Sequence, residues 1–481
     1  MKQFAANVID SLKAKRLTTG DCRVVETLTE SIEVRNGIVD SITRSTDLGF
    51  GVRVLKGNGW GFSSARDLTS EARDLVIKEA IEIAENSARV PGERDVRLAE
   101  LKPAQGAYRT QFKQDPFAVP LSEKLDLLVK AESILRQSPD VKIGYGSLYF
   151  TRLRKVFAST DGALLEQDIL YSGAGLTCLA IRDGEMQRRS YPAAFGGNWA
   201  QAGYEFVTGM ALAEHADPTR DEAVRLLSAP LCPEGKMDII IGTNQLALQV
   251  HESVGHPSEL DRVLGSEESY AGKSFVTLEK FRNFRYGSKH VNIHADAAVP
   301  LGLGTFGWDD EGVPAQRTAL VREGMFTNYL TSRETAPVVG LVSNGTMRAS
   351  GWNRIPLIRM TNINLEPGTW DLDALIADTK QGLFIDTNKS WSIDDRRLNF
   401  QFGTEIGWKI ENGKLAGMVR NPLYTGITPE FWNSCDAVCS AKHWRLWGLP
   451  NCGKGEPGQS AFVGHGCAPA RFRRVAVCAA K

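Results

Sequence analysis

MDIIIGTNQLALQVHESVGHP, residues 237–257, joins an apolar run to two histidines that bracket a glutamate. The run 237–242 is typical of a short buried strand, and the stripe of Leu246, Val250 and Val254 predicts a helix directly after it. We therefore expect a strand and a helix at the centre of the second half of the chain, with both histidines at the end of that helix.

His251, Glu252 and His256 are the residue types of a hydrolytic zinc site, in which two neutral imidazoles bind the ion and a carboxylate takes a proton from water. The helical zinc-protease motif spaces its histidines by four residues, which puts them on one face. Here they are five apart, and five steps along an α-helix rotate side chains by roughly 140°. We therefore expect a π turn or an unwound helix end, which Gly255 and Pro257 favour. The alternative is two unrelated histidines on a partly buried helix.

The composition is that of a globular protein of two or three domains, with 481 residues, 42% hydrophobic and 24% charged. Lys+Arg and Asp+Glu both number 57, and this zero net charge argues against an electrostatic nucleic-acid binder. No stretch is apolar for long enough to cross a bilayer, and the first ten residues lack the core of a signal peptide. We expect a cytoplasmic protein without nucleic-acid or membrane partners, whose eight cysteines are thiols or metal ligands.

The N-terminal half shows repeated hairpin signals. Tight turns between runs of alternating apolar residues are expected at Asn36-Gly37, Lys56 to Gly59, Asp161-Gly162 and Asp183-Gly184. The recurrence of strand, turn and strand in the same order indicates an internal duplication.

Helices and loops complete this half. Helices are expected from the N-terminus, from Thr69 or Ser70, from Ser122, and over Thr219 to Leu227. The proline-containing, aperiodic residues 90–120 predict a long loop. The Pro/Gly stretch 229–235 is the predicted boundary between an N-terminal α/β domain, residues 1–230, and a second domain, residues 231–481.

The second domain is predicted to be mostly β, which makes the whole fold α+β. Strand signals fall at 291–293, 320–321, 326–330 and 399–419, the last with a turn at Asn412-Gly413. The motif helix, with Thr243 or Asn244 as its N-cap, and a helix near Asp371 to Thr379 interrupt them. The polar segment Ser266 to Ser274 is expected to be a mobile loop beside the site.

Two patterns imitate functional motifs. Gly302, Gly304 and Gly307 fit the dinucleotide-binding spacing, but turn residues follow instead of a helix, so no nucleotide site is expected. The run 309–311, Asp-Asp-Glu, is typical of a solvated loop, and metal binding there is a minor alternative.

A catalytic zinc ion usually has three protein ligands, so the motif needs one more. Cys452 leads narrowly, because the glycines of NCGKGEPGQ, residues 451–459, predict a loop that can approach the motif helix closely. A cytosolic cysteine is more often a small buried hydrophobe. The alternatives are Cys435, Cys439, His465, Cys467 and Cys478.

Six short motifs are shared with a known family: VRNG (34–37), GVRVL (51–55), HExxxH (251–256), GWDDEGVPAQRT (307–318), RMTN (359–362) and CGKG (452–455). On these the chain resembles the TldD/PmbA family of metallopeptidases over most of its length, in the TldD-like branch that keeps both histidines. The resemblance implies that Zn²⁺ is held by His251, His256 and Cys452, with Glu252 as the base. It also implies an N-terminal α/β domain, a mostly β C-terminal domain and a dimer.

The expected function is that of a zinc-dependent peptidase that cleaves unfolded peptides or processes peptide precursors. Glu252 would act as general base toward water. The alternative is a non-catalytic scaffold or modulator subunit with a structural or absent metal. The expected partners are a peptide substrate and either a PmbA-like subunit or a second copy of the chain.

Overall fold

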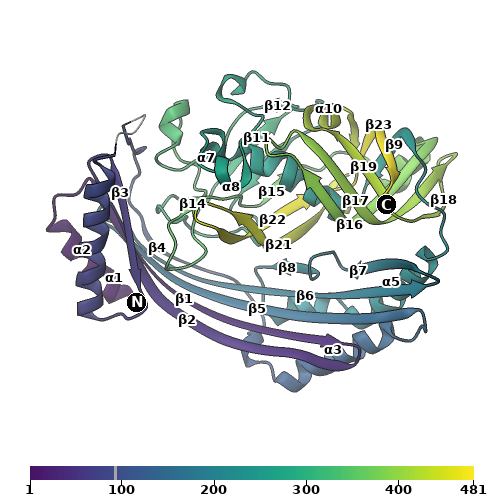
Figure 1. The fold of residues 1–481 in the computed structure, drawn as a ribbon, viewed down its shortest axis with the longest axis horizontal. Coiled ribbons are helices and arrows are strands. Elements are labelled where there is room, and N and C mark those ends of the chain that lie inside the picture. Colours follow the sequence, from purple (N-terminus) through teal and green to yellow (C-terminus); the bar gives the residue numbers. More distant parts are fainter. Residues whose placement is uncertain (91–94, 481) are drawn as a thin grey trace.

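The structure is a computed structural model that describes residues 1–90 and 95–480. Figure 1 shows a long curved sheet along one side of the molecule, with the C-terminal half of the chain lying on its concave face. Helices cover the outer face of this sheet near its two ends. The fold is α+β, as predicted, with a β-rich C-terminal region.

The curved sheet is built from the N-terminal half. Its strands are β1 (Thr19–Arg35), β2 (Ile38–Lys56), β3 (Gly59–Ala65), β4 (Gln105–Arg109), β5 (Val141–Ser159), β6 (Leu164–Arg182), β7 (Glu185–Tyr191) and β8 (Asn198–Ala200). Their order is β3-β2-β1-β5-β6-β4, and β7 and β8 also pair with β6. The accompanying helices are α1 (Lys2–Lys13), α2 (Ser70–Ser87), α3 (Leu121–Leu135), α4 (Tyr204–Gly209) and α5 (Leu212–Leu226).

The predicted turns organise this sheet. Asn36-Gly37 joins β1 to β2, and both residues have positive φ, as the tight hairpin turn requires. The first set runs α1-β1-β2-β3-α2, and the second begins in the same order as α3-β5-β6-β7 but adds β8 and α4 before α5. The two sets meet where β1 pairs antiparallel with β5. This arrangement supports the predicted duplication.

Three expectations for this half are wrong in detail. The predicted loop 90–120, of which residues 91–94 lie outside the described residues, contains β4, which pairs in parallel with β6. The last helix, α5, begins at Leu212 rather than Thr219 and continues through Pro218. Pro120, not Ser122, precedes the first turn of α3. The predicted boundary at 229–235 falls between α5 and the next strand and stays a prediction.

The C-terminal half builds a second large sheet. Its strands are β9 (Gly235–Ile241), β16 (Gln381–Ile393), β17 (Asn399–Glu411), β18 (Lys414–Val419), β19 (Pro422–Ile427), β20 (Cys435–Val438) and β23 (Ala470–Ala479). The order is β16-β9-β23-β19-β17-β18, and β16 also pairs with β17, which closes the sheet on itself. The turn at Asn412-Gly413 between β17 and β18 is confirmed.

Smaller elements surround this closed sheet. They are α6 (Thr243–Val250), α7 (Leu260–Val263), α8 (Glu268–Ala271), β10 (Ile293–Asp296), β11 (Arg317–Arg322), β12 (Met325–Phe326), β13 (Met347–Arg348), β14 (Leu357–Ile358), β15 (Ile363–Leu365), α9 (Leu372–Asp378), α10 (Thr428–Asn433) and the hairpin of β21 (Arg445–Lys454) and β22 (Gln459–Cys467). Strands β12, β11, β10 and β15 form a four-stranded sheet. The predicted loop Ser266 to Ser274 contains α8, and Glu267 within it is buried.

The strand and helix at the centre of the C-terminal half form as predicted. β9 runs into α6, and Leu246, Val250 and Val254 are fully buried in the largest core. The N-cap is Gly242 rather than Thr243 or Asn244. The side chain that binds a free amide of the first turn comes from β16, where Asp386 Oδ1 accepts from Gln245 N at 3.1 Å.

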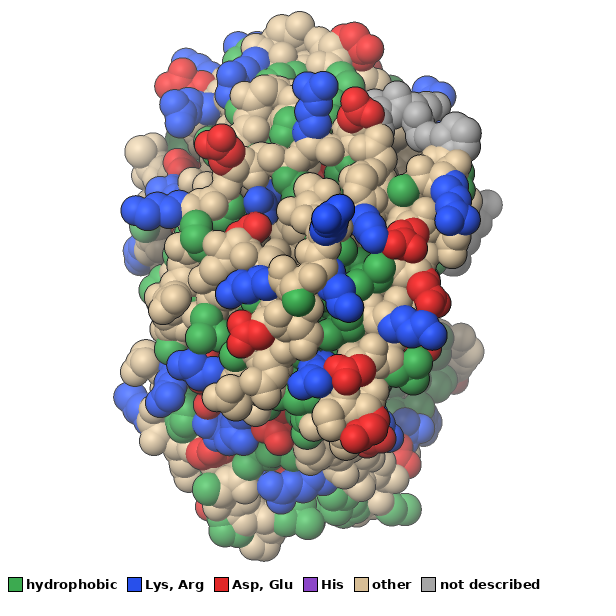
Figure 2. Space-filling model, turned by 90° about the vertical axis from the view of Figure 1, so that its left-hand side faces the viewer, with side chains coloured by type: hydrophobic (Ala, Val, Ile, Leu, Met, Phe, Trp, Pro, Cys, Tyr) green, Lys and Arg blue, Asp and Glu red, His purple; other side chains and the backbone are tan. Residues whose placement is uncertain are grey.

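The surface shows mixed charge. On the face drawn in Figure 2, basic and acidic side chains are interspersed among apolar and neutral ones, in keeping with the zero net charge of the sequence. Within the described residues, no helix combines the length and the apolar character needed to cross a bilayer.

Candidate metal centre

The two motif histidines meet because α6 changes into a π turn. Residues His251–Gly255 form this turn, and the His256 amide donates to the His251 carbonyl five residues back. This hydrogen-bonded loop is one residue wider than that of an α-helix, and the centroids of the two imidazole rings lie 4.8 Å apart, with the rings nearly perpendicular. A Cβ on Gly255 would lie 2.0 Å from Met360 Sδ, so this position has no room for a side chain. The predicted π turn is confirmed.

Cys452 joins the histidines from the other end of the C-terminal half. One ligand atom from each of His251, His256 and Cys452 lies within 4.8 Å of the other two, and all three residues are buried. His256 Nε2 is 3.8 Å from Cys452 Sγ. Donors around one tetrahedral zinc ion, at bond lengths of about 2.0–2.3 Å, are separated by about 3.3–3.8 Å. This buried N, N, S donor set therefore fits zinc after a small inward movement.

The protonation of these residues suits a metal. Burial lowers the pKa of His251 to about 4 and that of His256 well below its ordinary value, so both imidazoles are neutral. Burial raises the pKa of Cys452, but the Arg359 guanidinium and His256 outweigh this and bring it below its usual value. Arg359 also donates to the Cys452 carbonyl. Metal ligation requires neutral imidazole and thiolate, which this environment favours.

Cys452 reaches the centre from a strand and not from the expected loop. It lies in β21 and pairs with Ala461 of β22, so the hairpin and not glycine flexibility fixes its position. Burial raises the pKa of Cys435 and Cys439 to about 12 and raises that of Cys467. Cys478 lies within β23, opposite Leu423. None of these four cysteines belongs to the converging set.

Each histidine contacts, through its Nδ1 atom, a residue outside the converging set. His251 Nδ1 lies 2.8 Å from His465 Nε2, and His256 Nδ1 lies 2.9 Å from Glu259 Oε2. Because both Nδ1 atoms are bonded in this way, both Nε2 atoms are the ones available for the metal. His465, an alternative third ligand from the sequence, therefore lies behind His251 and not in the converging set. Glu259 was not predicted, and its only sequence signal is its place three residues after His256.

A buried ionic cluster lies behind Glu259. Lys454 Nζ is 2.8 Å from Asp261, 3.0 Å from Glu267 and 3.4 Å from Glu259. Arg262 pairs with Glu267 at 3.0 Å. Since β21 carries both Cys452 and Lys454, this cluster links the strand of one ligand to the carboxylate that orients another. Lys454 was not predicted as part of the site, although it lies in the CGKG motif, residues 452–455.

Glu252 lies in the same turn as the histidines and is paired with a distant arginine. Arg397 Nη1 donates to Glu252 Oε2 at 2.6 Å, and both side chains are largely buried. Arg397 lies in the tight connection between β16 and β17. No motif or spacing near Arg397 in the sequence points to this role.

The acidic run 309–311 is not a solvated loop, contrary to expectation. Asp309, Asp310 and Glu311 are 1%, 1% and 4% exposed. Asp310 pairs with Lys155 of the curved sheet at 2.5 Å, and Glu311 lies 3.5 Å from Arg53 of β2. The run lies between the two halves of the molecule, so its charges face basic residues of the first sheet and not solvent.

A buried centre of two histidines and a cysteine, with a glutamate in the same turn, is the arrangement of a metal-dependent hydrolase. Comparison with known families agrees. The PmbA/TldA metallopeptidase domain 1, central domain and C-terminal domain match residues 20–84, 114–229 and 234–478. The chain belongs to this family of hydrolases that act on peptides.

Individual relatives match most of the chain. A metalloprotease of Methanocaldococcus jannaschii is 30% identical over 93% of this chain and 94% of its own, and a zinc metalloprotease TldD homologue of Saccharolobus solfataricus is 22% identical over 82% and 83%. Two crystal structures share the fold. They are a candidate DNA-gyrase modulator of Thermotoga maritima, with a TM-score of 0.77, 18% identity and 99% of both chains covered, and TldE of Thermococcus kodakarensis, with a TM-score of 0.72, 16% identity and coverage of 99% and 100%.

Proposed function

We propose that the protein is a zinc-dependent peptidase whose metal is held by His251, His256 and Cys452. The observation that carries this proposal is the convergence of two neutral imidazoles and an acidified thiol within 4.8 Å, with a carboxylate in the same turn. When bound, zinc polarises water and the carbonyl of the scissile bond.

Glu252 moves the proton in this scheme. Oε2 is engaged by Arg397, which leaves Oε1 to take a proton as water attacks the carbonyl carbon. Glu252 then gives the proton to the amide nitrogen as the C–N bond breaks. The products are an amine and a carboxylic acid, which keeps the second proton of the water until it ionises to solvent, and the glutamate returns to its starting state.

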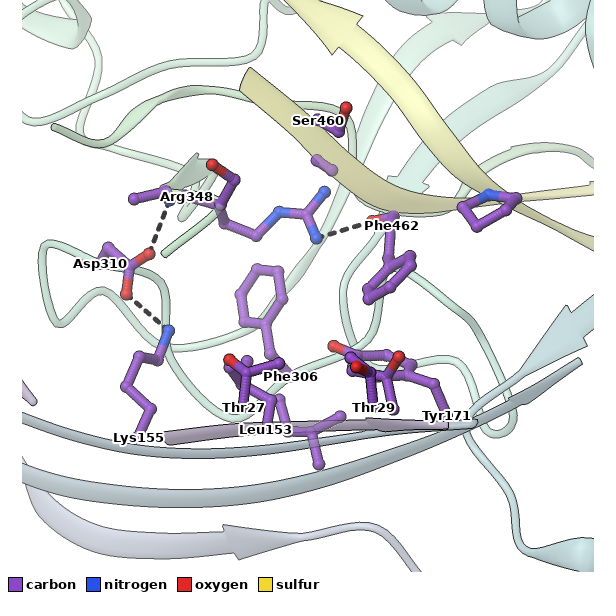
Figure 3. Close-up of a pocket in the computed structure, with 16 residues that line it drawn as sticks. Thr27, Thr29, Leu153, Lys155, Tyr171, Phe306, Asp310, Arg348, Ser460 and Phe462 are labelled. Atoms are coloured by element: carbon purple, nitrogen blue, oxygen red, sulfur yellow. Dashed lines mark hydrogen bonds and ion pairs between the residues drawn. The ribbon is translucent and has the colours of Figure 1, made fainter. Parts of the chain in front are cut away.

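A cavity of about 260 Å³ supports a peptide as substrate. Figure 3 shows it between the curved sheet, which contributes Thr29 and Tyr171, and a roof that includes Arg348 and Phe462. Ala461, which pairs with Cys452, also lines it, so the cavity adjoins the strand that carries a ligand. Apolar side chains and hydroxyl or charged side chains both line it, and its size suits a short segment of an unfolded chain.

Metal-dependent cleavage tests this function. Zinc-loaded protein should cleave unfolded, quenched-fluorescence peptides, lose activity with a chelator and regain it when zinc is added back. Glu252→Gln should keep zinc and lose turnover, because an amide cannot take a proton at neutral pH. The matched control is Glu268→Gln at an exposed glutamate of α8. A protein that binds zinc but cleaves no peptide, alone or with its partner, would instead be the scaffold or modulator of the alternative hypothesis.

We also propose that the chain works as a dimer, with a PmbA-like subunit or with itself. The likeness to TldE supports a shared architecture between two such chains. Light scattering after gel filtration, for the chain alone and mixed with a PmbA-like chain, would distinguish the two assemblies. A monomer under both conditions would contradict the proposal.

A further inference from the structure

The β16–β17 connection brings a guanidinium into the metal centre from 145 residues away in sequence. Arg397 lies there at a φ of +62°, a left-handed conformation that costs energy for any residue other than glycine. Its backbone is fixed from both sides, because its amide bonds to the Asp394 carbonyl at 2.8 Å and its carbonyl accepts from Thr428 Oγ1 at 2.8 Å. The turn thus holds one side chain in place at an energetic cost.

The contacts of this guanidinium are incomplete. Nη1 donates to Glu252, and Nε is buried without a hydrogen-bond partner among the described residues, while the side chain as a whole stays 15% exposed and so can be approached from one side. A buried donor without a partner costs roughly 1–3 kcal/mol, so such groups call for an explanation. A substrate oxygen that enters beside Glu252 and accepts from this guanidinium would explain the missing partner.

The position of Arg397 is central to the site. Its charge acts on Glu252, Glu259 and Cys452, and it contributes to the lowered pKa of both His251 and His256. It is therefore near every residue that the proposed reaction uses, yet it forms no hydrogen bond or ion pair with a metal ligand.

We propose that Arg397 is a catalytic residue of the peptidase: it holds the Glu252 carboxylate and donates its free N–H to the oxygen of the scissile carbonyl. Negative charge develops on that oxygen as water attacks, and a fixed donor in a buried site stabilises the charge more than a solvated one does. The planar guanidinium can bond two groups at once, which a lysine ammonium does less well. This inference rests on the proposed peptidase function.

The test compares Arg397→Gln and Arg397→Lys with Arg396→Gln, a control at the exposed neighbour in the same turn. Removing one oxyanion donor reduces kcat by about 10²–10³, and we expect this loss for the glutamine variant with KM changed less than about threefold. The kcat of the lysine variant should lie between those of wild type and the glutamine variant, and the kcat of the control should equal that of wild type. Zinc content should equal that of wild type in all three.

A phosphinic peptide provides a readout that needs no turnover, since its tetrahedral P–O⁻ group mimics the charged oxygen. Its affinity for zinc-loaded Arg397→Gln should fall by the same factor as kcat/KM, while that of a product-like peptide stays unchanged. A glutamine variant with wild-type kcat and analogue affinity would overturn the inference. So would equal losses of zinc, analogue and product binding, which would indicate a structural role.

These outcomes separate the inference from the function on which it rests. If wild-type protein shows no zinc-dependent cleavage, the proposed function fails, and analogue binding still decides whether Arg397 recognises a tetrahedral anion. If wild type cleaves and Arg397→Gln cleaves equally well, only the inference fails.

Discussion

The contact between His465 and His251 sets the tautomer of a metal ligand. His465 Nδ1 lies 3.2 Å from the Ile363 carbonyl, which can only accept, so that nitrogen carries the proton. Burial lowers the pKa of His465 well below its ordinary value, so the ring is neutral and its Nε2 must accept from His251 Nδ1. His251 Nε2 is then the unprotonated atom, as a metal ligand must be.

Replacing His465 by leucine should therefore weaken zinc binding without removing a ligand. The substitution leaves a buried N–H of His251 without a partner, at a cost of about 1–3 kcal/mol. At 1.4 kcal/mol per factor of ten, this predicts a rise in the zinc Kd of about 5- to 150-fold. Mutation of a residue that hydrogen-bonds a metal ligand typically lowers metal affinity 10- to 100-fold, and the predicted range agrees with this.

The assay is competition for zinc against a chromophoric chelator, with thermal unfolding to confirm folding. His465→Gln should recover most of the affinity, because its side-chain oxygen can accept from His251. The control is His443→Leu, since His443 interacts with Asp371 and Leu372 instead of the centre. Wild-type affinity in the leucine variant, or equal losses for leucine and glutamine, would refute the reasoning. A loss beyond about a thousandfold would make His465 a ligand.

Three further predictions concern the centre and its surroundings. Zinc should be lost after dialysis against a chelator in each of His251→Ala, His256→Ala and Cys452→Ser, and each variant should remain folded because the cores are large. Serine at any of the other C-terminal cysteines should leave the zinc content unchanged. The opposite pattern would move the third ligand to Cys435, Cys439, Cys467 or Cys478. Lys454→Met should reduce the free energy of unfolding by about 3–5 kcal/mol in urea titrations, since it leaves buried Asp261 without a cation and Glu259 and Glu267 with Arg262 alone, whereas the exposed Lys442→Met should change it little. The metal-free protein should lose stability as pH falls from about 6.5 to 4, because the unfolded chain then binds a proton at His251 that the folded chain, with a His251 pKa of about 4, does not. His251→Gln should reduce the slope of the unfolding free energy against pH by up to about 1.4 kcal/mol per pH unit. An unchanged slope would contradict the lowered pKa of His251.

The features that could be predicted from the sequence are those fixed by short-range geometry. A five-residue spacing cannot place both histidines on one face of an α-helix, and this indicated a π turn or an unwound helix end, of which the π turn is the one that forms. Asn36-Gly37 and Asn412-Gly413 supply residues that tolerate positive φ, so the hairpins could be located. β4 escaped prediction because its pairing with β6 depends on the rest of the sheet.

The missing parts of the site depend on tertiary contacts. Nothing near Arg397 in sequence indicates that it meets Glu252, and the burial of Asp310 depends on Lys155 and Arg23 of a sheet that closes over it. The strand position of Cys452 was missed because its neighbouring glycines suggest a loop. In this segment the pairing of β21 with β22 overrides local propensity.

The contacts around the proposed ligands explain how a turn that carries only two of them could hold a metal. The π turn fixes His251 relative to His256, but each imidazole could still rotate about its own bonds. His465 of β22 restrains one ring and Glu259 the other, and Lys454 of β21 binds Glu259 in turn. Both strands belong to the hairpin that also supplies Cys452. Docking of this one hairpin therefore delivers the third ligand and orients the first two, so the donor set should be complete only in the fully folded C-terminal half.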